Sequence, residues 1–202
     1  MKKLTILFQI SIFFFITGGN ISAQSFGMKL GMNFSKTTDY RDDFDEIKMR
    51  PGLNVGPIVE YNVADNFYIQ SGLLFSQKGL KIDDNAKVSI YYLELPLNLI
   101  NKFEMEPVTI MYGVGPYFAY GIKSKVKYKD DDQTVIRSVD LGYDHDDDDF
   151  IPADFGIGLN AGVEYSSIQF NFEWGIGLTD IAHRYPSMFN RRFGITVAYL
   201  IN

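Results

Sequence analysis

The chain has 202 residues, a formal net charge of -6 at pH 7 and no cysteine. The charge argues against a nucleic-acid partner, and the lack of cysteine excludes a disulfide framework or a thiolate metal site. The 17 Phe, 13 Tyr and 18 Gly residues are typical of strongly curved sheets and of strands that meet a membrane interface.

The first 23 residues have the order of a secretory signal peptide. Lys2 and Lys3 precede an apolar run over 4–16, and small or polar residues follow as far as Ala23. The apolar run has about 13 residues, whereas a membrane-spanning helix needs roughly 17 to 25. We therefore predict a signal peptide over 1–23, with an uncleaved anchor as the alternative, and a mature domain over 24–202. Because no later run is long enough for a helix, a mature chain that spans a membrane must do so as strands.

Eight later segments alternate between large apolar side chains and polar residues or glycine. The clearest is 168–178, where Phe170, Phe172 and Trp174 alternate with polar residues and glycine. Since successive strand side chains point to opposite faces, each segment has one apolar and one polar face. The predicted strands are 27–35, 52–63, 67–78, 88–103, 108–123, 154–165, 168–178 and 192–201. Prolines 57, 96 and 116 remove ladder donors, so we expect a bulge or a local break near them.

Short and long connections alternate between these strands. Those at 64–66, 104–107 and 166–167 are short, and those around 36–51, 79–87, 124–153 and 179–191 are longer. Outer-membrane barrels have short periplasmic turns and longer external loops. The predicted fold is therefore all-β, an eight-stranded antiparallel up-and-down transmembrane β-barrel with lipid outside and a polar lumen, so we assign 24–202 to an outer-membrane β-barrel domain.

Aromatic residues of outward parity gather at both ends of the predicted strands, as the interfacial belts of such a barrel do. The predicted periplasmic belt comprises Phe26, Tyr61, Phe67, Phe103, Tyr165 and Tyr199, and the outer belt Phe34, Phe75, Tyr91, Tyr120, Phe155 and Phe193.

The polar face carries charged side chains that we expect to meet in the lumen. The predicted cluster is Lys29, Glu60, Glu94, Lys123, Glu164, Glu173 and Arg192. An eight-stranded barrel is just wide enough for side chains to fill, and an uncompensated buried charge costs several kcal/mol. We therefore expect an ion-paired filling of the lumen; the alternative is a proton or ion path, or a ligand site.

An acidic loop follows the fifth predicted strand, with aspartates at 130–132 and 144–149 except for His145. Hard divalent cations favour several carboxylate oxygens, yet the spacing of a calcium loop is absent. We expect a solvated loop and no metal site; Asp144, Asp146 and Asp148 are the candidates for weak calcium binding.

Enzymatic signals are sparse. His183 and Ser187 share one external loop, which leaves an outer-membrane lipid-modifying enzyme as a minor alternative. There is no G-x-S-x-G nucleophile motif and no phosphate-binding G-x-x-x-x-G-K motif. We expect no catalysis and no cofactor.

The segment Tyr-Leu-Glu-Leu-Pro-Leu at 92–97 resembles the "YLEIPL" strand of the PorT-like outer-membrane β-barrel proteins. The Ser-Ala-Gln at 22–24, the strand at 27–34 and the segment at 112–117 are also similar to that family. The resemblance covers essentially the whole mature chain. It implies a small outer-membrane barrel; most members have no assigned activity, and the name-giving member serves protein secretion.

Taken together, these patterns predict an integral protein of the bacterial outer membrane, exported by its signal peptide, that anchors and displays external loops. The expected partners are outer-membrane lipid and other envelope or secretion proteins, with no nucleic acid. The alternatives are a narrow pore or a secretion-associated barrel. A soluble lipocalin-like binder, with its apolar face turned inward, is a further rival.

Overall fold

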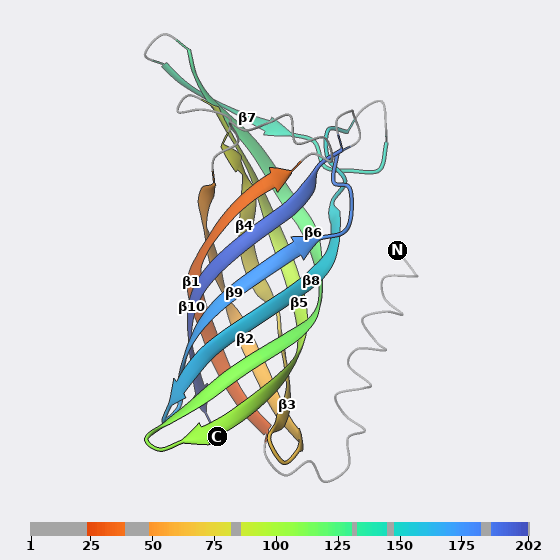
Figure 1. The fold of residues 1–202 in the computed structure, drawn as a ribbon. Helices are drawn as coiled ribbons and strands as arrows, with labels where there is room; N and C mark the ends of the chain where they lie inside the picture. The colour runs from red at the N-terminus through yellow and green to blue at the C-terminus, as the bar shows by residue number, and fades with distance from the viewer. Residues whose placement is uncertain are drawn as a thin grey trace.

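The computed structural model describes residues 24–38, 49–81, 86–130, 133–144, 148–182 and 187–201. The predicted signal peptide lies outside these ranges. The described chain forms the ten strands drawn in Figure 1: β1 (Gln24–Thr38), β2 (Arg50–Ala64), β3 (Phe67–Gly72), β4 (Leu74–Lys81), β5 (Ala86–Met105), β6 (Val108–Asp130), β7 (Gln133–Val139), β8 (Ala153–Tyr165), β9 (Ile168–Gly177) and β10 (Phe189–Ile201). Among the described residues, no helix is long and apolar enough to cross a membrane.

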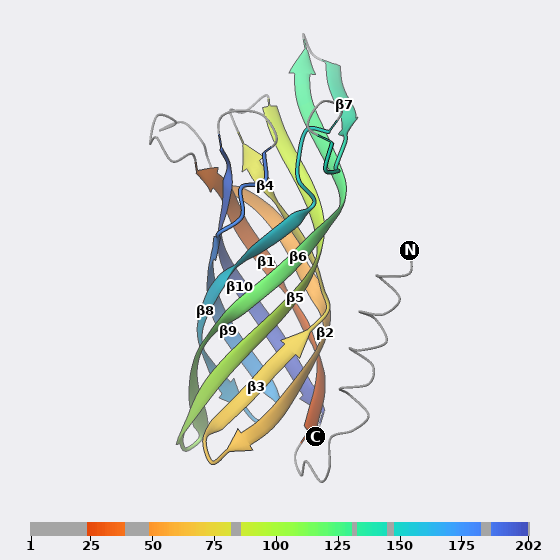
Figure 2. The same ribbon diagram turned by 90° about the vertical axis from the view of Figure 1, so that its right-hand side faces the viewer.

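The strands close into a ring by antiparallel pairing. β1 pairs with both β2 and β10, and the ladder continues through β9, β8, β6 and β5 to the β3 and β4 segments, which pair back onto β2. β3 and β4 are two parts of one barrel strand, and β7 pairs only with the outer extension of β6. The predicted eight-stranded antiparallel up-and-down barrel is confirmed (Figures 1 and 2).

The break between β3 and β4 has a cause in the neighbouring strands. It falls at Leu73, between the pair that joins Ile58 to Gly72 and the pair that joins Val55 to Phe75. Pro57 on β2 and Pro96 on β5 flank this point, and neither can donate a backbone hydrogen bond to the ladder. The carbonyl of Pro57 instead accepts from the amide of Leu73 at 3.1 Å, and that of Pro96 accepts from the Ser71 hydroxyl at 2.7 Å.

The two faces of each strand meet different surroundings, as the alternation predicts. In β9, exposed and buried residues alternate from Ile168 to Trp174. Trp174 is 47% exposed and Leu95 on β5 is 50% exposed, so the bulky apolar face lies on the outside of the ring. The polar face lies inside it. This arrangement is the opposite of a lipocalin-like barrel, whose apolar face is turned inward.

The two ends of the barrel differ. At one end, short turns join β2 to β3, β5 to β6 and β8 to β9. The start of β1 and the end of β10 lie at this same end, where Phe26 pairs with Ile201. At the other end β6 continues beyond the ring and forms a hairpin with β7 that projects from the barrel (Figures 1 and 2). Part of the predicted loop at 124–153 is therefore regular strand.

Candidate functional site

The lumen is filled with charged and amide side chains that the inward parity of the strands brings together. Besides Arg50, four cations and four carboxylates expose less than a tenth of their surface: Lys29, Lys78, Lys102, Arg192, Glu60, Glu94, Asp154 and Glu173. Because each is taken out of bulk water, each needs an opposite charge or a hydrogen bond to offset its lost hydration.

The first group of contacts lies near the short turns. Lys102 on β5 forms ion pairs with Glu60 on β2 and with Glu164 on β8, the latter at 2.7 Å between Nζ and Oε2. The Gln169 amide donates to Oε2 of both carboxylates, at 3.1 Å for Glu60 and 2.8 Å for Glu164. Gln70 donates to Glu60 as well, at 2.9 Å. One lysine and two amides thus share the charge of two carboxylates.

The second group lies around Glu173. Lys29 Nζ stands 2.9 Å from Glu173 Oε1, and the Thr196 hydroxyl donates to the same oxygen at 3.2 Å. Lys29 also donates to Gln70 Oε1 at 3.4 Å, which connects this group to the first. Arg192 bridges onward, with Nη2 3.9 Å from Glu173 and Nη1 2.8 Å from Glu94.

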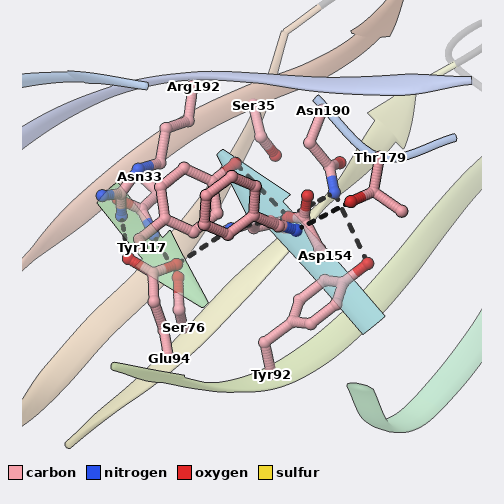
Figure 3. A network of polar contacts seen from close by, with 12 residues as sticks. Asn33, Ser35, Ser76, Tyr92, Glu94, Tyr117, Asp154, Thr179, Asn190 and Arg192 are labelled. Carbon is pink, nitrogen blue, oxygen red and sulfur yellow. Dashed lines mark hydrogen bonds and ion pairs between the residues drawn. The ribbon is translucent and has the colours of Figure 1, made fainter. Parts of the chain in front are cut away.

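The third group surrounds Lys78, which is fully buried (Figure 3 shows its polar neighbours). Its Nζ lies 2.8 Å from Glu94 Oε2 and 3.0 Å from Asp154 Oδ2. The same ammonium lies 4.3 Å from the ring centroid of Tyr117 and 5.1 Å from that of Tyr92, so aromatic faces cover the sides that carboxylates leave open.

The same oxygen of Asp154 that meets Lys78 has two further partners. The Asn190 amide donates to its Oδ2 at 2.9 Å, and the Tyr117 hydroxyl donates to the same atom at 3.5 Å (Figure 3). The three groups therefore form one network that runs along the lumen from Glu164 to Asn190. Its chemistry is pairing: each cation in it is within 4 Å of a carboxylate oxygen.

Glycines on the lumen wall make room for the largest members of this network. A Cβ on Gly156 would come within 2.6 Å of the Tyr117 ring, and one on Gly175 within 2.8 Å of Arg192 Nε. A real Cβ essentially never makes contacts this short, so the ring and the guanidinium can keep these positions only because the wall has no side chain there.

An apolar cover closes the network toward the end that carries the longer connections. Ile181 is fully buried and packs with inward residues of β4, β5 and β6. The buried cluster comprises Leu80, Val88, Ile90, Tyr92, Tyr117, Ala119 and Ile181. The partly buried residues packed against it are Val126, Leu141, Phe150 and Met188. The backbone of Ile181 is fixed by its carbonyl, which accepts from Ile151 at 2.9 Å, and by its amide, which donates to Met188 at 2.9 Å. The segment after β9 thus covers the lumen.

Asp180 fastens this cover. Its Oδ1 accepts from the backbone amides of Met188 at 2.8 Å and of Ala182 at 3.1 Å. Burial alone would raise the pKa of Asp180, but these bonds and that of the Ser187 hydroxyl hold the pKa below its ordinary value. The carboxylate therefore remains charged and fastened throughout the neutral range, and its contribution is lost only as the pH falls through the lowered pKa.

A second apolar cluster lies inside the barrel toward the short turns. It comprises Ile58, Leu74, Ala198 and Leu200, all buried, and Ala198 is the cross-strand partner of Lys29. Ile58 is two residues from Glu60 on β2 and Ala198 pairs with Lys29, so this apolar cluster packs beside the first two groups of ion pairs. Such packing keeps water away from the ion pairs and strengthens them.

Six of the seven predicted lumen residues lie inside the barrel and belong to the network: Lys29, Glu60, Glu94, Glu164, Glu173 and Arg192. Sequence reasoning missed Lys78, Lys102 and Asp154. Lys78 and Lys102 have inward parity near the ends of the predicted strands 67–78 and 88–103, and Asp154 is the first residue of the predicted strand 154–165. The alternation, applied through to the strand ends, would have found all three.

Lys123 is the exception, and its predicted place in the lumen is wrong. The register between β5 and β6 shifts by one residue between Tyr91, which faces Lys123, and Tyr92. Ile122 is the extra residue of this β-bulge, which reverses the alternation beyond it. Ile122 and Lys123 are both exposed, and Ser124 is the next residue that is buried.

Two of the three candidate calcium ligands lie in the described part of the acidic loop. The Asp148 amide donates to the carbonyl of Asp144 at 2.9 Å, and Asp148 Oδ2 accepts from the Asp144 amide at 2.9 Å. The Asp148 carboxylate thus serves a turn. Asp146 and His183 lie outside the described residues. Among the described residues, no group of three or more His, Asp or Glu could hold a metal ion.

Comparison with known proteins places these features in context. Residues 22–183 match the protein family described as "Outer membrane protein beta-barrel domain". Neisserial surface protein A is similar in structure, with a TM-score of 0.50 and 9% identity over 88% of this chain and 99% of that one. Ail, the attachment invasion locus protein of Yersinia pestis, has a TM-score of 0.48 and 11% identity over 89% and 100%. At these identities the similarity concerns the fold alone. No curated protein matches the sequence.

Proposed function

Because the chain belongs to the outer membrane protein β-barrel domain family, we propose that it is a rigid anchor that displays its long loops outside the cell and performs no catalysis. The observation that carries this proposal is the filled lumen. Charged side chains are paired across it, apolar residues around Ile181 cover them at one end, and those around Ile58 pack beside them. A barrel with such an interior gains rigidity from it and offers its loops and outer face to partners.

The anchoring itself follows from closure and facing. Each barrel strand pairs with neighbours on both sides, so its backbone groups are satisfied without water. The bulky outward side chains then match the hydrocarbon. We propose in addition that residues 1–23 direct export, that the chain belongs to the PorT-like group of such barrels, and that its protein partners are other envelope or secretion proteins.

Trp174, the single tryptophan, tests the anchor directly because its side chain points outward. We expect brominated phospholipid to quench its fluorescence strongly when the processed chain is reconstituted in vesicles, and the chain to resist a carbonate wash. A matched control is Trp174→Phe combined with Tyr143→Trp, because Tyr143 lies in the acidic loop and is 66% exposed; its fluorescence should survive. A monodisperse chain in plain buffer, with Trp174 unquenched, would favour the lipocalin-like alternative.

The filled lumen also predicts how the barrel behaves electrically. Since Lys78, Arg192 and their carboxylates occupy the interior, we expect no discrete conductance steps in planar bilayers. The recording is made on protein whose folding is shown by heat-modifiable gel migration, with lipid alone as the blank. Regular single-channel steps from such protein would support the narrow-pore alternative instead.

A further inference from the structure

The outer wall of the barrel carries a groove among its bulky apolar side chains. The groove has a volume of about 610 Å³ and is lined mainly by outward residues of β5, β6, β8 and β9. The smallest of these is Ala161 on β8, whose cross-strand neighbours are Tyr112 on β6 and Phe172 on β9. Both rings are more than half exposed, so they stand on either side of the small alanine. We call this feature the wall groove.

The wall groove crosses the lipid-facing part of the barrel at an angle. On one side it follows a row of cross-strand partners that includes Leu99 on β5, Leu159 on β8 and Trp174 on β9. Because the strands are strongly tilted (Figure 1), such a row climbs from one end of the barrel toward the other. The lining therefore extends from Phe67 of the periplasmic aromatic belt to Phe193 of the outer belt, and the part between them faces hydrocarbon.

A polar amide lies at the periplasmic end of the wall groove. Asn101 on β5 is the cross-strand partner of both Phe67 on β3 and Tyr112 on β6, and it is partly exposed on the same outward face. Polar side chains that face a membrane are costly unless they find a polar partner. At the depth of the periplasmic belt, the ester carbonyl of a lipid is an acceptor that the bilayer itself supplies.

The exposed charged side chains of the described turns beside this end are negative. The turn between β2 and β3 reaches β5, where the Asn66 carbonyl accepts from the Lys102 amide at 2.8 Å. Asp65 in this turn and Glu104 and Glu106 next to the following one are exposed, whereas the Lys102 side chain is buried in the ion-paired network. A lipid headgroup that ends in an ammonium group is complementary in charge to these carboxylates.

We propose that the wall groove holds one acyl chain of a phosphatidylethanolamine molecule of the inner leaflet, with its ester carbonyl bonded to the Asn101 amide and its ammonium group beside Asp65 and Glu104. The groove is continuous with the lipid-facing wall, so its occupant comes from the bilayer. A second barrel fits poorly, because two convex walls meet along a narrow strip and a stable dimer buries roughly 1,200 Å² or more. This inference rests on the proposed function, which places the short turns on the periplasmic side of the membrane.

The test counts the lipids that stay bound when the full barrel is released from nanodiscs made of equal amounts of phosphatidylethanolamine and phosphatidylglycerol. In native mass spectrometry we expect the wild type to retain a single phospholipid, with phosphatidylethanolamine favoured roughly two- to fivefold, the effect of one exposed ion pair. Ala161→Phe fills the wall groove and should reduce retention about tenfold or more. Val163→Phe is the matched control, because Val163 is exposed on the same strand but lies outside the groove.

Asn101→Leu tests the contact with the ester. Losing one hydrogen bond should reduce retention of the diester lipid roughly fivefold. The same substitution should leave retention of a diether analogue unchanged, because that lipid has no carbonyl to accept the bond. Equal losses for the two lipids would show that Asn101 acts through packing alone and would overturn the proposed contact.

Other results would overturn the occupant or the site. Equal retention by the wild type and Ala161→Phe places the bound lipid elsewhere, and equal retention of the two headgroups excludes recognition of the ammonium group. A retained free fatty acid, or a wild-type dimer that Ala161→Phe dissociates, gives the groove a different occupant. Heat-modifiable gel migration shows that each variant is folded, and Ala161→Leu replaces Ala161→Phe if the latter is not. A wild-type chain that does not enter the nanodisc refutes the proposed function itself, whereas normal insertion without a retained lipid refutes only this inference.

Discussion

Replacing Lys78 with Met is expected to destabilise the folded barrel by about 3–5 kcal/mol. The ammonium of Lys78 is fully buried and is shared by Glu94 and Asp154, at 2.8 and 3.0 Å. Methionine fills a similar volume but, among the described residues, leaves the Asp154 carboxylate with the Asn190 amide and the Tyr117 hydroxyl as partners. When a buried carboxylate has no cation beside it, most of the hydration free energy that it lost on folding is not recovered, and the folded state is destabilised by that amount.

Reversible unfolding in denaturant, measured in lipid vesicles at neutral pH, gives the change in free energy. Lys123→Met is the matched control, because Lys123 is exposed; its effect should stay within about 0.5 kcal/mol. Comparing Lys78→Met with Lys123→Met also tests whether the Lys123 side chain lies on the outside of the barrel. If Lys123→Met were the more damaging variant, the bulge at Ile122 and the network around Lys78 would both be misplaced.

Replacing Leu95 with Arg is expected to destabilise the barrel by about 2–4 kcal/mol, the cost of a cation in the middle of the hydrocarbon. Leu95 is half exposed on the outside of β5 and lies between Tyr91 and Phe103, which belong to the two aromatic belts. Its cross-strand partner on β6 is Phe118, which is 50% exposed on the same face and offers the guanidinium no carboxylate.

Phe103→Arg on the same strand is the control for depth. Phe103 lies next to the short turn between β5 and β6, where an arginine reaches the headgroups, and its cost should fall to about 0–1 kcal/mol. Both variants are compared with wild type by denaturant unfolding in vesicles. Equal effects of the two substitutions would contradict a membrane centred between the aromatic belts.

Much of the lumen could be predicted because the period of a strand is two. Glu94 lies between Leu93 and Leu95, and Glu173 between Phe172 and Trp174, so any strand at these positions separates carboxylate from lipid. The same reasoning placed Lys29, Glu60, Glu164 and Arg192 correctly. It failed at Lys123 because a bulge is a property of two paired strands, and one strand read alone carries no sign of the shift in register.

The ion pairs themselves could not be predicted. Lys29 and Glu173 are 144 residues apart, and Lys78 and Asp154 are 76 apart. Which cation meets which carboxylate depends on the relative stagger of all the strands around the closed ring, since each register shift moves a side chain along the lumen axis. The place of Ile181 over the network is likewise set by where the segment after β9 meets β4 and β5.

The amino-acid sequence by itself determined the number of strands in the ring, the order of short and long connections and which face of each strand meets lipid. These follow from local alternation, which acts through side-chain direction within a single strand. Only the tertiary structure decided the bulge at Ile122, the break at Leu73, the partners of each charge and the covering of the lumen. Those depend on contacts between strands distant in sequence, which exist only once the ring has closed.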